Sequence, residues 1–68
     1  MNKDIIKGNW QQVKGKLKEQ WGKLTDDDVT RIEGNADEFY GILQERYGYD
    51  KDRTEKEVNE FIETNKWH

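Results

Sequence analysis

The chain has 68 residues, of which 31% are apolar and 40% are charged, and its formal net charge is −3. This length supports one domain, residues 1–68, with one small core. The absence of cysteine excludes disulfide bonds and thiolate metal sites. Because the chain also has no run approaching the ~20 apolar residues of a membrane span and no apolar leader, we expect a cytoplasmic protein.

Two stretches of the sequence resemble each other after a shift of 26 residues. Residues 8–22 read GNWQQVKGKLKEQWG, and residues 34–48 read GNADEFYGILQERYG. A unit that is repeated in this way usually cannot bury its own apolar face and packs against its copy. The identical or similar pairs are Ile6/Ile32, Gly8/Gly34, Asn9/Asn35, Val13/Phe39, Gly15/Gly41, Leu17/Leu43, Glu19/Glu45, Trp21/Tyr47, Gly22/Gly48 and Asp26/Asp52.

The first copy predicts a long helix followed by a short one. Apolar residues spaced by three and four between Trp10 and Leu24 indicate a helix over 4–21, with Asn9 as a cap and Gly22 at its end. Residues 3–8 form either its first turn or a separate turn. A second helix, over 26–33, follows Thr25 and begins with three aspartates, whose charges suit the positive end of a helix dipole.

The second copy repeats this pattern. A helix over 36–47 begins at Asn35, which with Glu38 resembles a capping box, and it ends at Gly48. Asp50 caps a fourth helix over 51–64. The predicted fold is therefore all-α, a small bundle of two tandem α-hairpins with four helices.

Gly15 and Gly41 lie in the middle of predicted helices, where glycine costs about 1 kcal/mol relative to alanine. At 100° per residue they face away from the apolar stripe. Either another backbone approaches there closely, from a neighbouring helix or a partner protein, or glycine is merely tolerated on a solvent face. Because both copies carry the glycine, we favour close approach.

The residues needed for common catalytic chemistry are missing. The chain has neither serine nor cysteine, and its single histidine is the terminal His68. Nucleophilic triads and ordinary zinc sites are therefore not expected. The acidic run 26–28 lacks the alternating ligands of a calcium loop, and no phosphate-binding loop is present. We predict no enzymatic activity, no metal and no cofactor.

Lysines give the strongest binding signal, although it is a weak one. Lys7, Lys14 and Lys18 fall close to one face of the first predicted helix, and residues 1–24 are net basic whereas residues 25–68 are net acidic. Such a row is typical of a nucleic-acid or anionic membrane surface. It is equally typical of the solvated face of an amphipathic helix, which is the interpretation we favour.

The segments WQQVKGKLKEQWGKLTDDD and LQERYGYDKDRTEKEV resemble the CsbD-like family of small bacterial general stress-response proteins. The resemblance covers nearly the whole chain. It implies a bacterial cytosolic protein that is produced under stress, such as osmotic shock or entry into stationary phase, with no enzymatic activity and no cofactor. It also implies two crossed α-hairpins, similar to SAM-like and helix-hairpin-helix folds.

Helix-hairpin-helix proteins bind DNA phosphates through glycine-rich turns. The corresponding turns here, residues 22–25 and 48–51, keep one glycine each and lie beside acidic residues, which argues against DNA binding through them. Three functional hypotheses remain. They are a protective, hydrophilin-like protein, a binder of nucleic acid or an anionic surface through the lysines, and a helical adaptor whose protein partner packs on Gly15 and Gly41.

Overall fold

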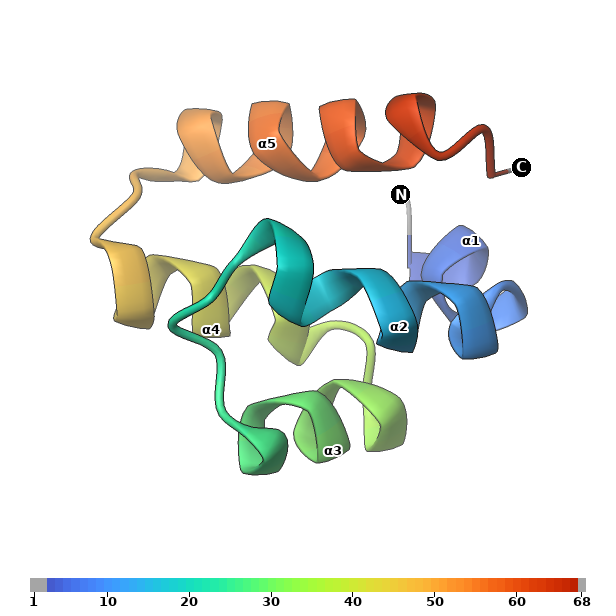
Figure 1. The fold of residues 1–68 in the computed structure, drawn as a ribbon. Coiled ribbons are helices and arrows are strands. Elements are labelled where there is room, and N and C mark those ends of the chain that lie inside the picture. Colours follow the sequence, from blue (N-terminus) through green and yellow to red (C-terminus); the bar gives the residue numbers. More distant parts are fainter. Residues whose placement is uncertain (1–2, 68) are drawn as a thin grey trace.

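A computed structural model describes residues 3–67. Within this range all regular structure is helical, which confirms the all-α class (Figure 1). The helices predicted at 26–33, 36–47 and 51–64 are present, whereas the one predicted at 4–21 is divided in two. The five helices are α1 (Lys3–Gly8), α2 (Trp10–Gln20), α3 (Asp26–Gly34), α4 (Glu38–Tyr47) and α5 (Lys51–Thr64).

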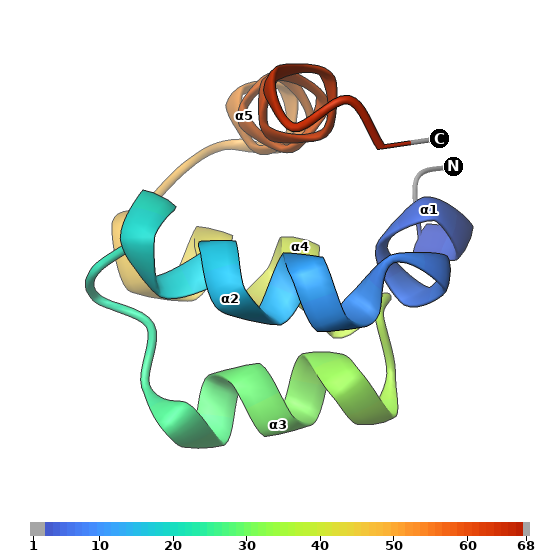
Figure 2. The ribbon, with the colours of Figure 1, turned by 45° about the vertical axis from the view of Figure 1, so that its right-hand side comes forward.

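The helices are stacked in levels. In both views α2 and α4 lie between α5 on one side and α3 on the other (Figures 1 and 2). Each helix contacts the next one along the chain. The α2–α3 and α4–α5 turns lie at one end of the molecule, and α1 lies at the opposite end, as does the C-terminal end of α5 (Figure 2). No helix within residues 3–67 has the length and apolar character to cross a membrane.

All five helices contribute to one apolar core. Positions that correspond in the two repeated stretches, such as Ile6 and Ile32 or Leu17 and Leu43, are buried in both. The burial of equivalent positions explains why the same spacing recurs in the sequence. The buried apolar residues are Ile6, Val13, Leu17, Trp21, Leu24, Val29, Ile32, Phe39, Ile42, Leu43, Val58, Phe61, Ile62 and Trp67.

Aromatic rings join the helices at the centre of this core. Trp21, just after α2, meets Phe39 of α4 and Phe61 of α5 edge to face, with ring centroids 5.4 and 4.8 Å apart. Phe61 also meets Trp67 in this geometry, at 5.0 Å. Such pairs contribute ~0.5–1.5 kcal/mol beyond the apolar area that they bury.

Polar caps define the starts of α3 and α5. The Asp28 N–H donates to Thr25 Oγ1 at 3.1 Å, and the Thr25 N–H donates to Asp28 Oδ2 at 3.0 Å, which completes a capping box. The Arg53 N–H donates to Asp50 Oδ1 at 2.7 Å, so the predicted Asp50 cap is confirmed. Each cap satisfies backbone N–H groups that have no partner inside the helix.

Asn9 occupies the N-cap position of α2, as predicted, but neither Asn9 nor Asn35 forms a side-chain cap of the following helix. The Asn9 amide donates to the Ile5 carbonyl at 2.9 Å and so interacts with the preceding helix. Asn35 Oδ1 accepts from the Asp37 N–H at 3.0 Å, and α4 begins only at Glu38. Asparagine competes for nearby backbone groups in this way, so it bends the chain between helices in both copies.

The two glycines that were expected to end helices differ in backbone conformation. Gly48 follows α4 with φ of 69°, the left-handed conformation that suits glycine, so this prediction is confirmed. Gly22 is not left-handed. Instead α2 ends on Trp21, with φ of −129° and ψ of 86°, and the indole is buried in the core.

An ion pair between the buried Asp28 and the partly exposed Arg46 holds α3 against α4. Arg46 donates from Nε and Nη2 to the two Asp28 oxygens at 2.9 and 3.0 Å, and the Asp28 side chain is only 1% exposed. These hydrogen bonds lower the pKa of the Asp28 carboxyl from 3.8 to about 2; burial opposes the shift and Thr25 adds to it. The sequence analysis assigned Asp28 only to the helix dipole, although the Thr25-x-x-Asp28 spacing is itself a capping signal.

We predict that Asp28→Asn lowers the free energy of unfolding by about 2 kcal/mol at pH 7, because Arg46 then loses its charged partner. The depressed pKa stabilises the native state fully above pH ~4, and this contribution is lost as pH falls toward 2. Urea unfolding followed by circular dichroism measures both effects, so the gap between wild type and variant should close in acid. Asp27→Asn, at an exposed neighbouring position, is the matched control. An equal loss in both variants would contradict the assignment.

Candidate functional site

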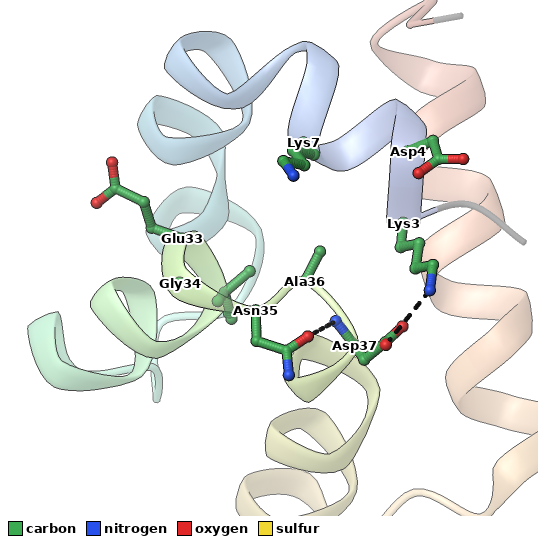
Figure 3. A pocket seen from close by; sticks show the side chains of 9 residues that line it. Lys3, Asp4, Lys7, Glu33, Gly34, Asn35, Ala36 and Asp37 are labelled. Carbon is green, nitrogen blue, oxygen red and sulfur yellow. Dashed lines mark hydrogen bonds and ion pairs between the residues drawn. The ribbon is translucent and has the colours of Figure 1, made fainter.

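The predicted lysine row is divided between two helices. Lys14 and Lys18 lie one turn apart on α2, and both are exposed. Lys7 lies on α1, before the bend at Asn9, and its side chain points into a cleft (Figure 3). The structure therefore brings two of the three lysines together on one helix and separates the third.

Some basic residues of α1 and α2 have acidic partners elsewhere in the chain. Lys18 Nζ lies 2.5 Å from Asp26 Oδ1 and lowers the pKa of that carboxyl, and Lys3 Nζ lies 3.5 Å from Asp37 Oδ2. The uneven charge of the sequence is thus partly compensated within the molecule. Because these pairs are exposed, each contributes little to stability. Within residues 3–67, Lys7 and Lys14 form no ion pair.

Gly15 and Gly41 lie on exposed positions of α2 and α4. A Cβ atom added at either glycine would meet no atom within 4 Å. The predicted close approach of a neighbouring helix is therefore wrong, because the helices pack through the opposite, apolar faces that carry Leu17 and Leu43. Packing of a partner protein on these glycines stays a prediction.

The cleft beside Lys7 separates α1 from the junction between α3 and α4. Its volume is about 300 Å³, and residues 32–37 line it opposite Lys3, Asp4 and Lys7. Figure 3 shows the Ala36 methyl group pointing into it, and the Lys3–Asp37 ion pair spans one side. Sequence analysis missed this cleft, because it depends on how α1 is placed after the bend at Asn9.

The two turns compared with helix-hairpin-helix motifs meet at the other end of the molecule. The Lys23 N–H donates to Tyr47 Oη at 3.0 Å, so this backbone amide already has an acceptor. Tyr47 stacks on Tyr49 with centroids 5.3 Å apart, while Lys23 lies over the first ring and Arg53 over the second. The contacts of Lys23 with Tyr47 tie the two turns together.

The acidic side chains of the described chain do not converge on a metal site. Residues 3–67 contain no group of three or more acidic or histidine side chains that could hold a metal ion. Asp26, Asp27 and Asp28 diverge, because the first pairs with Lys18, the second is exposed and the third is buried against Arg46. His68 lies outside the described residues.

Comparisons with known proteins give consistent matches. The family model described as CsbD-like matches residues 4–56. A UPF0337 protein of Pectobacterium atrosepticum is 60% identical over 68 residues, covering 100% of this chain and 99% of that protein. The UPF0337 protein YjbJ of Escherichia coli K12 is 61% identical over 67 residues, covering 98% and 97%. A UPF0337 protein of Bordetella pertussis is 52% identical over 65 residues, covering 96% and 98%.

Proposed function

Because the chain belongs to the CsbD-like family, we propose that it is a non-catalytic protein of the bacterial general stress response that protects other macromolecules when water is scarce. The observation that carries this proposal is the high density of exposed charges on the surface of α5. The outer face of α5 is a dense field of exposed charges of both signs, whereas its apolar residues are buried in the core. The exposed charged residues of α5 are Lys51, Asp52, Arg53, Glu55, Lys56, Glu60 and Glu63.

Charged side chains hold water more strongly than neutral polar ones do, because removing an ion from water is so costly. A compact domain that carries such a surface keeps a hydrated layer around itself and, when abundant, between neighbouring proteins. Interspersed signs also avoid a large field of one sign, so the surface separates neighbours without binding one of them tightly. The proposed activity therefore needs no catalytic group.

We predict that the purified protein preserves the activity of a labile dehydrogenase through drying and rehydration better than an equal mass of a folded control protein of similar size. A variant with Lys51, Glu55, Lys56 and Glu60 all changed to glutamine keeps the net charge but removes four exposed charges. It should protect less, while its helicity by circular dichroism stays unchanged. Equal protection by the variant, or none by the wild type, would remove the proposal.

A second candidate function is binding to a phosphate-rich anionic surface through Lys14 and Lys18. The observation that favours it is the absence of an ion pair at Lys14 within residues 3–67, together with the exposure of both lysines one turn apart. The ion pair of Lys18 is on the surface, so a phosphate can replace Asp26 at little cost. This candidate predicts weak binding that depends strongly on salt.

For this second candidate, Lys14→Glu with Lys18→Glu should abolish binding to a labelled DNA duplex and to vesicles of anionic lipid. Fluorescence anisotropy and vesicle sedimentation measure the two targets at several salt concentrations. The matched control is Lys51→Glu with Lys56→Glu, which changes the net charge equally at another exposed site. If both double variants lose binding to the same extent, net charge and not the α2 surface is responsible, and the candidate fails.

A further inference from the structure

The cleft between α1 and the α3–α4 junction has an origin in the repeated sequence. Position 36 corresponds to position 10 after the shift of 26 residues, so the second copy carries alanine where the first carries tryptophan. Trp10 is half-buried and packs against the core. Ala36 places only a methyl group at the equivalent junction, so space stays open in front of it.

Charges of opposite sign face this space. The Lys7 side chain points into the cleft (Figure 3) and has no ion pair within residues 3–67. On another side, the Asp37 carboxylate holds Lys3 at 3.5 Å, and the two side chains are 49% and 46% exposed. A pair so exposed is weak, so the carboxylate is free to exchange Lys3 for another cation at little cost.

The remaining charges disfavour a simple anion. Asp4 and Glu33 belong to the rim, although Figure 3 shows their carboxylates pointing away from the centre of the cleft. The lining therefore carries three carboxylates against two lysines, in a protein whose net charge is −3. A molecule with no net charge escapes this repulsion and still meets both Lys7 and Asp37.

We propose that this cleft binds a small zwitterion of the amino-acid type. Its carboxylate lies against the Lys7 ammonium, its cationic group lies against the Asp37 carboxylate, and its methylene groups lie over Ala36 and the buried Ile32. A volume of about 300 Å³ is large enough for an ω-amino acid with a few carbons. Because both charge contacts are open to solvent, each should strengthen binding only about fivefold, so the Kd should be on the order of tens of millimolar.

Nuclear magnetic resonance titration of the whole chain tests the proposal. The probes are glycine, β-alanine and γ-aminobutyrate, which separate the same two charges by increasing distances, at constant pH and ionic strength. We expect saturable shifts of the Lys7 amide and of the amides of residues 34–37, with one length preferred. Acetate and methylammonium, which carry one charge each, should bind at least about fivefold more weakly, the loss of one ~1 kcal/mol contact.

Two variants separate a specific site from a general effect of charge. Lys7→Gln should weaken the best zwitterion about fivefold, whereas Lys56→Gln, an equal charge change on α5, should leave the Kd unchanged. Ala36→Trp should fill the cleft and abolish the shifts; its spectrum also reports whether the variant is folded. The proposal is overturned if no saturable shift occurs near residues 34–37, if acetate binds as well as the zwitterions, or if Lys7→Gln binds like the wild type.

Discussion

The contact of Trp21 with Phe39 and Phe61 is the interaction on which the rest of the structure depends. Trp21 is 2% exposed, and its partners come from α4 and α5, so a single indole joins helices from both copies of the repeat. With only 31% apolar residues, the chain has few side chains that can bury much area. Trp21 follows the buried Val13 and Leu17 at intervals of four residues, which places its ring on the same, buried side.

Polar contacts then fix how the helices sit around these rings. The Asp28–Arg46 pair sets α3 against α4, and the contacts of Lys23 with Tyr47 join the two turns at one end. At the other end the bend at Asn9 places α1 across from the α3–α4 junction and so forms one side of the cleft. The same packing leaves the outer faces of α2 and α5 charged and exposed, and the proposed functions depend on those faces.

Local signals account for the parts of the fold that the sequence predicts. The spacing of apolar residues places α3, α4 and α5 correctly. Asp50 caps the start of α5 and Gly48 ends α4, as predicted, because a cap depends only on neighbouring residues. The sequence left open whether residues 3–8 are separate from the first long helix, and it did not predict the burial of Asp28. The burial of Asp28 depends on Arg46, a residue distant in the sequence and on another helix, and the spacing of apolar residues contains no information on such a contact.

In the candidate sites, too, local spacing predicts one part and the packing of the helices determines the other. Lys14 and Lys18 share a surface because four residues make about one helical turn. Lys7 departs from that row because its helix ends at Gly8. The cleft could have been suspected from the change of Trp10 to Ala36 between the copies. Its charged lining, however, required the placement of α1 in the structure.

Native-state hydrogen exchange of the Phe61→Leu variant tests most directly whether the aromatic contacts couple the two copies into one cooperative core. This substitution removes the ring and keeps an apolar side chain. If Trp21 and Phe61 couple the copies, the amides of Val13 and Leu17 in α2 should lose as much protection as those of Ile42 and Leu43 in α4. Full protection retained in α2 while α5 exchanges freely would contradict that coupling.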